Sequence, residues 1–280
     1  MQTLPAGQWE LLLVDNASDE TLEKSWDLSW HPRARHLRED KPGKTHALLT
    51  AIGEAQGELL MTVDDDNVLE RDYLEATLRI GRDHPWLAVW GGNCLAEFEA
   101  APPKFLEKYL GFIAVSAVTR PRWGNSSVDF ECIPPGAGMT FRRVIAEAFR
   151  RNLEHPQYRE FLPGGQVKRR GFGFHDTMIA LTAIDLGFGA GRFPELKLVH
   201  LIPKHRVDPQ YMLGLIKGDA AMTVILNHLR NQMPTARNQE SGWFRALWLR
   251  LRLSHFDYQA WKASQAGVKD GMLMLGHSHH

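Results

Sequence analysis

The 280-residue sequence has little of several features that mark special classes of protein. It has two cysteines, Cys94 and Cys132, which favours a reduced cytosolic protein over a secreted one held together by disulfide bonds. Its 33 Lys and Arg residues equal its 33 Asp and Glu residues, so no overall positive charge argues for a nucleic-acid partner. The longest apolar run, residues 110–118, has about half the length that a membrane-spanning helix requires, and no signal sequence is recognisable.

The composition is that of an ordinary globular protein, with 44% hydrophobic and 24% charged residues. Up to residue 85, apolar runs of strand length alternate with segments of helical spacing. The predicted strands cover residues 9–15, 34–38 and 58–63, and the predicted helices cover about 20–27, 41–56 and 69–84. This alternation predicts an α/β fold with a doubly wound, mostly parallel sheet.

The pattern after residue 85 is less regular. It predicts one or two strands over 88–98, a helix over 102–118, and a glycine-rich turn that leads into a strand and then a helix over 143–152. A loop-rich stretch over 153–175, a helix over 175–187 and a strand from 196 follow. From residue 210 onward, helical patterns dominate.

Acidic residues follow two of the predicted strands. The first strand ends in VDNASD, residues 14–19, and the third ends in VDDDN, residues 63–67. Because ligands of such sheets sit beyond the carboxyl ends of the strands, we expect the two motifs to be neighbours in space. The triple Asp is either a solvated turn or a site for Mg²⁺ or Mn²⁺, which take carboxylate oxygens together with substrate phosphates.

Other segments have both a functional and an ordinary interpretation. A Pro-Gly turn with Lys41, Lys44 and His46 is either a phosphate contact or a plain basic helix start. The turn PGAGMTFRR, residues 135–143, either lets the backbone approach a ligand or simply precedes a pair of surface arginines. Asp176 stands near a predicted helix start, where a carboxylate often serves as a cap.

Together, these segments resemble the family 2 inverting glycosyltransferases of the GT-A fold. The resemblance covers about residues 2–220 and follows the order and spacing of WELLLVDNASDETL, GKTHALLTAIGEAQGELLMTVDDDN, PPGAGMTFRR, GFHDTMIAL and LVHLIPKHR. It implies a GT-A domain over 1–210, with a nucleotide-sugar half over about 1–95 and an acceptor half over about 96–210, and a helical extension over 211–280. It also implies a nucleotide-sugar donor, a glycan or lipid-linked acceptor, and Mn²⁺ or Mg²⁺.

The resemblance assigns roles to single residues. It makes Asp66 the metal ligand, with Asp64 and His200 beside it, and Asp176 the catalytic base. It places the donor against Asp15, Asn16, Lys44, Asp64, Asp65, His175 and Arg206.

Two residues depart from the family pattern. Asn16 stands where many members carry a second Asp that binds the nucleobase, so a uridine donor does not follow. His175, in Phe174-His175-Asp176, replaces the usual acid before the base, and its charge state raises or lowers the reactivity of Asp176.

The start of the sequence departs from the family as well. Members begin with a strand and a helix ahead of the strand at 9–15, whereas residues 1–5 resemble only the end of that helix. A chain of this length would lack one parallel strand and leave an apolar edge or slot, which favours either completion by a partner or, more simply, an incomplete sequence.

The segment 242–253 mixes Trp, Phe and Leu with three arginines. It is either a helix packed with its arginines outward or a peripheral membrane contact, which places the protein in the cytoplasm or at the inner face of the membrane. Two further functions remain open, a non-catalytic binding module and, more weakly, a nucleotidyltransferase.

Overall fold

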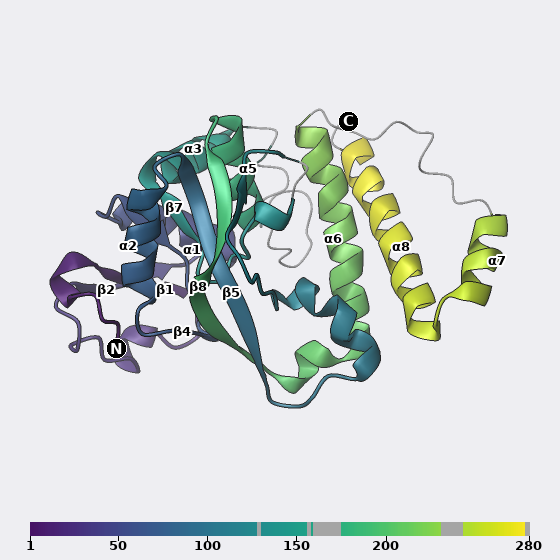
Figure 1. Cartoon of the computed structure of the whole chain (residues 1–280), viewed down its shortest axis with the longest axis horizontal. Helices are drawn as coiled ribbons and strands as arrows, with labels where there is room; N and C mark the ends of the chain where they lie inside the picture. The colour runs from purple at the N-terminus through teal and green to yellow at the C-terminus, as the bar shows by residue number, and fades with distance from the viewer. Residues whose placement is uncertain (128–129, 156–157, 159–174, 231–242, 278–280) are drawn as a thin grey trace. The chain divides into compact units, whose positions relative to one another are not determined.

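The computed structural model describes residues 1–127, 130–155, 158, 175–230 and 243–277, and it forms two compact units (Figure 1). The first unit consists of residues 1–97 and 114–201, and the second of residues 98–113 and 202–280. Residues 98–113 therefore group with the C-terminal helices, although they fall within the acceptor half expected from the sequence.

The first unit contains two sheets. In the smaller one, β1 (Leu11–Asn16) pairs in parallel with β2 (Ala34–Glu39). The larger one follows the order β3 (Leu59–Met61), β7 (Thr140–Arg142), β5 (Leu87–Phe98), β8 (Gly189–Ile202) and β4 (Asn67–Leu69), with β6 (Arg122–Gly124) paired to β8. The pairs β3·β7, β5·β7, β4·β8 and β6·β8 are antiparallel. The α/β class agrees with the prediction, and β1 with β2 supplies the predicted parallel pairing.

Strands β1 and β3 are both sheet edges in the described part of the chain, because β1 pairs with β2 and β3 with β7. Just before β1, the Glu10 carboxylate accepts hydrogen bonds from the backbone N–H groups of Gln56 and Gly57, which shortly precede β3.

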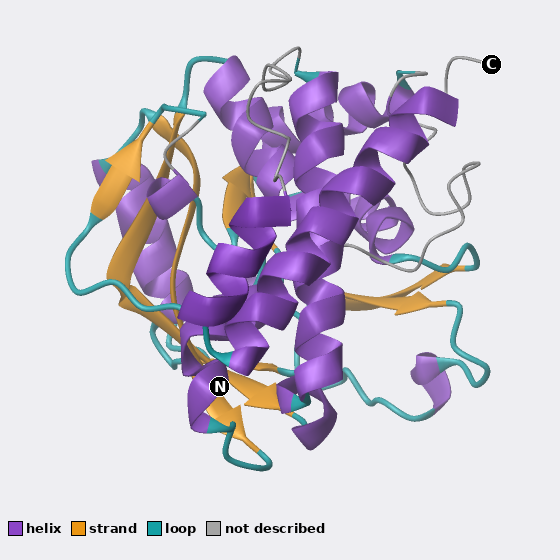
Figure 2. Cartoon of the chain, turned by 90° about the vertical axis from the view of Figure 1, so that its right-hand side faces the viewer, coloured by secondary structure: helices purple, strands orange, loops and turns teal. Residues whose placement is uncertain are grey.

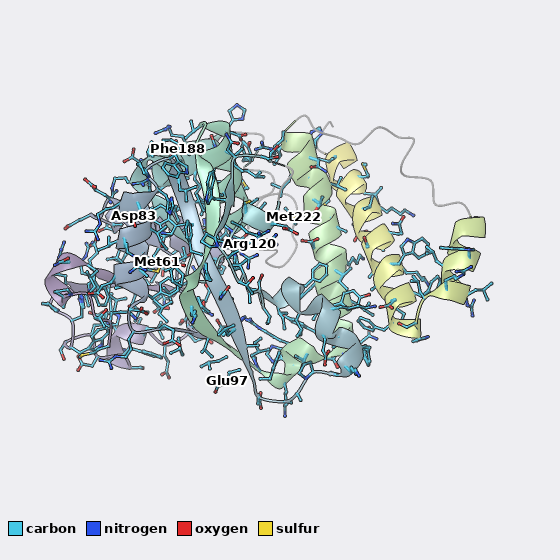
Figure 3. All side chains as sticks on the ribbon, viewed as in Figure 1. Met61, Asp83, Glu97, Arg120, Phe188 and Met222 are labelled. Carbon is cyan, nitrogen blue, oxygen red and sulfur yellow. The ribbon has the colours of Figure 1, made fainter. Side chains whose placement is uncertain are left out.

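Helices α1 (Lys44–Glu54), α2 (Tyr73–Asp83), α3 (Arg143–Glu154) and α5 (His175–Asp185) complete the first unit. In α2, the buried residues Tyr73, Ala76 and Ile80 recur with helical spacing, so one face of the helix enters the core. That core is built around Trp90, and Met61, labelled in Figure 3, packs against it. Helix α5 stops as predicted, since Gly187 adopts a φ of +84° just after it.

The second unit is almost entirely helical in its described part (Figure 2). It contains α6 (Pro209–Leu229), α7 (Trp243–Arg252), α8 (His255–His277) and the 3₁₀ segments η3 (Lys104–Ile113) and η5 (Lys204–Val207). Helices α6 and α8 pack closely against each other. Gly267 allows this approach, since a Cβ at this position would lie 2.0 Å from the Lys217 carbonyl oxygen. Of the described helices, none has both the length and the apolar character needed to cross a membrane.

Two predicted helices are wrong. Residues 20–27 form only the short 3₁₀ segment η2 (Leu22–Lys24), because the Asp15 carboxylate takes the Leu22 N–H and fixes the loop instead. Residues 102–118 are helical only over η3, and Ala114 leaves the helical region with a φ of +62°. The remaining 3₁₀ segments are η1 (Ala6–Gln8) and η4 (Phe130–Cys132). The short strand β4 was not predicted.

Candidate active site

The acidic turn after β3 is held at its first residue by a lysine. Lys44 Nζ donates to Asp64 Oδ1, and the Asp64 carbonyl oxygen accepts from the Asn67 N–H at 3.1 Å. Lys44 is the first residue of α1, so this helix start reaches the end of β3. Asp65 is exposed at the tip of the turn. The basic helix start therefore contacts the acidic turn, which the sequence interpretation did not predict.

Asp66 faces a histidine that is distant in the sequence. His200 Nε2 lies 3.2 Å from Asp66 Oδ2, and Asn67 Nδ2 donates to Asp66 Oδ1 at 3.0 Å. The β4·β8 pairing places Asn67 opposite His200, and the Leu201 N–H donates to the Asp66 carbonyl oxygen at 2.8 Å. Sheet register therefore brings together two residues that are 134 positions apart.

The glycine-rich turn before β7 lies against the residue that leads into the acidic motif. Thr62 Oγ1 donates to the Gly136 carbonyl oxygen at 2.7 Å, and the Gly138 N–H donates to the Thr62 carbonyl oxygen at 2.9 Å. Tyr73 Oη donates to the Gly138 carbonyl oxygen, and Gly138 has a φ of +70°, which a side chain would strain. The sequence interpretation missed Thr62 and Tyr73. The only signal for Thr62 is a hydroxyl inside an apolar strand.

Asp176 lies in the first turn of α5, against this same glycine turn. A Cβ at Gly136 would lie 2.9 Å from Asp176 Oδ2, so a side chain at this position would clash with the carboxylate. Asp176 Oδ1 accepts from the Thr177 N–H at 2.8 Å, as a carboxylate at a helix start commonly does. The chain from Thr62 through Gly136 to Asp176 connects the predicted metal motif to the predicted base.

His175 is buried beside these groups. Burial lowers the pKa of His175 below its ordinary value, and the nearby charges are those of Asp176, Lys44 and Asp64. The ring is therefore neutral near pH 7 and adds no positive charge that would weaken Asp176 as a base. Phe174, the first residue of that motif, lies outside the described residues.

The end of β1 is built differently. Asp15 accepts from the Ser18 and Leu22 N–H groups and, at 2.7 Å, from Arg38 Nη1. The hydrogen bond from Ser18, followed by those from Leu22 and Arg38, holds the pKa of Asp15 well below its ordinary value despite its burial.

Asn16 is equally engaged, because its amide bonds the backbone of Glu39, Lys41 and Gly43. Gly43 directly precedes Lys44, which pairs with Asp64. One loop thus connects the two acidic strand ends, and the predicted proximity of the two motifs is confirmed.

Three arginines from the sequence motifs complete the set of candidates. Arg206 belongs to the second unit, in η5, and its role at the donor stays a prediction. Arg142 donates to the carbonyl oxygens of Leu87 and Gly81, and Arg143 to those of Gly57 and Ala55. Both arginines therefore tie backbone segments together, which corresponds to neither interpretation drawn from the sequence.

The predicted metal ligands have suitable chemistry but incomplete geometry. Carboxylate and imidazole groups are ligands that Mn²⁺ accepts, and Asp66 and His200 converge. Asp64, however, is paired with Lys44, and the described residues contain no group of three or more His, Cys, Asp or Glu arranged to hold a metal ion. A cation here would need oxygens from a bound diphosphate and water to complete its ligand shell.

One comparison, that with protein-family models, agrees with the motif interpretation. Residues 2–94, about a third of the chain, match the family model described as Glycosyl transferase family 2. No curated protein matches the sequence. Among solved structures, the chain is similar to the crystal structure of S. aureus TarS 1-349, with a TM-score of 0.48 and 12% identity over 99% of this chain and 84% of that one. The family match over residues 2–94 agrees with the family that the motifs predict, and it supports a glycosyltransferase.

Proposed function

We propose that this chain, whose residues 2–94 carry the family 2 glycosyltransferase sequence, is a metal-dependent inverting glycosyltransferase. It moves a sugar from a nucleotide diphosphate to a hydroxyl group of a glycan or lipid-linked acceptor. The observation that carries the proposal is the convergence of the β3 end, the glycine turn and the start of α5, which places Asp64, Asp66 and Asp176 in one region.

In this proposal Asp176 is the catalytic base. Inversion requires a carboxylate that takes the proton of the acceptor hydroxyl while its oxygen attacks the anomeric carbon opposite the leaving diphosphate. The packing of Asp176 against Gly136 and its bond to the Thr177 N–H fix the direction of the carboxylate before substrate arrives. Neutral His175 leaves Asp176 free to accept the proton.

Asp66 and His200 would hold the divalent cation, and Lys44 would face the donor diphosphate. The bound cation would neutralise negative charge on the leaving diphosphate. Lys44 adds a second positive charge at the end of β3. The ion pair with Asp64 holds the Lys44 ammonium group at this position.

Replacing the base tests the assignment. We expect Asp176→Asn to lower kcat by about 10²–10⁴-fold, the usual contribution of a general base, and to leave donor affinity unchanged. The matched control is Asp83→Asn, since Asp83 is exposed at the end of α2 (Figure 3). Full activity in Asp176→Asn, or in wild-type protein after exhaustive chelation, would contradict the base or the metal assignment respectively.

One observation favours a second candidate, a non-catalytic binding module. Strands β1 and β3 are separate edges, and Asp15 and Asn16 are already bonded to the protein. Calorimetry with several sugar nucleotides and Mn²⁺ decides between the two candidates, because the module is favoured only if the folded chain binds none of them.

The acceptor class has its own support in the second unit. In α7, Trp248 and Leu251 are exposed, and the Arg252 guanidinium lies 5.3 Å from the Trp248 ring. An exposed apolar face with adjacent arginines suits contact with an anionic membrane and therefore a lipid-linked acceptor. Co-sedimentation with anionic and neutral vesicles tests this, and the Trp248→Ser variant should bind the anionic vesicles less.

A further inference from the structure

The first unit contains a cavity that none of the predicted site residues lines. Its volume is about 520 Å³, and it is bordered by Arg120, Pro121, Arg122, Trp123, Glu131 and Cys132. Such a volume is typical of small-molecule sites, which span about 300–1,000 Å³. Arg120, labelled in Figure 3, stands just before β6, and β6 itself contributes Arg122 and Trp123.

One of the arginines that line the cavity, Arg122, is paired across two strands with a second arginine. Strand β6 pairs with β8 so that Arg122 lies directly opposite Arg192. Like charges in this arrangement repel each other and destabilise a sheet. A fold keeps such a pair at low cost only when an anion lies close to both groups.

Arg192 is buried without a carboxylate bonded to its side chain among the described contacts. Its residue is only 9% exposed, Nη2 donates to Ser116 Oγ at 2.6 Å, and Nε is buried without a hydrogen-bond partner in the described structure. Burial and the charge of Arg122 both lower the pKa of Arg192. A buried guanidinium with an unused donor is costly, and an anionic ligand would remove that cost.

The acid that is present compensates little. Glu131 pairs with Arg122, but the Glu131 side chain is 72% exposed, and such surface pairs contribute about 0–1 kcal/mol. Among the described residues, Arg120 and Arg122 line the cavity together with the solvated Glu131 carboxylate, and Arg192 lies opposite Arg122. The region keeps a positive charge that a dianion would neutralise.

From this geometry we infer that the cavity binds a phosphate ester carried on a sugar or polyol. Guanidinium groups bind phosphate oxygens in a forked geometry, which explains why arginines supply the charge. The volume exceeds that of a lone phosphate group, and the half-exposed Trp123 ring offers an apolar surface for the carbon skeleton. Trp86 supports that ring, with 5.9 Å between the two centroids.

Calorimetry on the whole chain without metal or nucleotide tests the inference. Glycerol 3-phosphate is the soluble probe, vesicles containing phosphatidic acid present the same group on a lipid, and glycerol is the uncharged control. We expect saturable binding of at least one phosphate ester, weakened by salt, and none of glycerol. Binding by only one probe identifies the source of the ester. Absence of binding by both overturns the inference.

Variants locate the binding. Arg122→Gln and Arg192→Gln should each weaken phosphate-ester binding about tenfold, which corresponds to about 1.4 kcal/mol. Arg79→Gln, on an exposed position of α2, is the matched control and should not change it. Arg122 is half-buried on a short strand, so its variant keeps the test valid even if Arg192→Gln fails to fold. Equal affinity in Arg122→Gln and wild type would contradict the inference.

A separate titration with several nucleoside diphosphates and Mn²⁺ distinguishes this site from the proposed donor site. Arg122→Gln should bind the nucleotide like wild type. If wild-type protein binds no nucleotide, this result counts against the proposed function and leaves the phosphate-ester result unaffected.

Discussion

The ends of β1 and β3 look alike in sequence, VDN and VDDDN, but differ in what their side chains contact. At β1, Asp15 and Asn16 are bonded mainly to backbone groups, and Arg38 adds a salt bridge. At β3, Asp64 and Asp66 face the side chains of Lys44 and His200. Side-chain partners can move when a ligand arrives, whereas backbone partners belong to the fold. The first end therefore builds the loop, and the second remains available for chemistry.

Of the two strand ends, the β3 end should show the larger effect on activity. Asp66→Asn should lower kcat/KM by about 10²–10³-fold, because it removes the carboxylate proposed to hold the cation. A bound cation stabilises the charge of a transition state by several kcal/mol. The free energy of unfolding should change little, since Asn keeps the shape and the contacts with Asn67 and His200. Steady-state kinetics and urea unfolding measure the two quantities. An Asp66→Asn enzyme as active as Asp83→Asn would remove the difference between the strand ends.

The β1 end should respond in the opposite way. Asn16→Ala removes three bonds to the loop that precedes α1 and should lower the free energy of unfolding by about 1–3 kcal/mol. Activity per folded molecule should stay close to that of wild type, because the remaining chemistry lies at β3. Urea unfolding and kinetics at a temperature where the variant is folded test this. A stable variant that loses its preference among nucleobases would instead restore the donor role predicted from the sequence.

Much of this arrangement was accessible from the sequence, and the exceptions have physical causes. Apolar runs identified β1 and β3. The glycine-rich turn over 135–143 and the acid at the start of the predicted helix over 175–187 identified the region of Asp176. All of these are local signals, which a sequence shows directly. The partners of Asn16 were not accessible, because a side chain that bonds a distant backbone leaves no periodic pattern. The same holds for Arg142 and Arg143, whose carbonyl acceptors are 55–88 residues away.

Long-range register is the other limit. The pairing of β4 with β8 brings His200 to Asp66, yet β4 has only three residues and no recognisable strand signal. The resemblance to a family predicted the result without predicting the strand that produces it. Arg192 is a second example. The sequence shows an arginine at this position of β8, but only the register of the sheet shows that it lies opposite Arg122.

A smaller effect is expected at the lysine that connects the two ends. Lys44→Gln should change the free energy of unfolding by less than about 1 kcal/mol, because Lys44 and Asp64 are both partly exposed. It should raise the KM for the donor more than it lowers kcat, since the charge acts on the bound diphosphate. Lys41→Gln, on the same loop, is the matched control. Equal KM values for the two variants would make Lys44 an ordinary helix-start residue.

The smallest effect concerns pH and the base of the β1 sheet. His31 is buried against the Trp9 ring, with 4.0 Å between centroids, and burial together with Arg33 lowers the pKa of His31. At pH values below the ordinary histidine pKa of about 6.5, the unfolded chain binds a proton at His31 that the folded chain does not bind. The free energy of unfolding therefore falls as the pH decreases. This single proton contributes at most about 1.4 kcal/mol per pH unit.

His31→Phe and His31→Gln remove that proton and should both flatten the decline of stability between pH 7 and 5, as measured by urea unfolding at each pH. Two replacements of different polarity separate the loss of titration from changes in packing. If both variants keep the wild-type slope, His31 takes up its proton in the folded state as well. In that case the aromatic cluster beneath β1 is open to solvent, and the β1 end is less firmly built than its hydrogen bonds indicate.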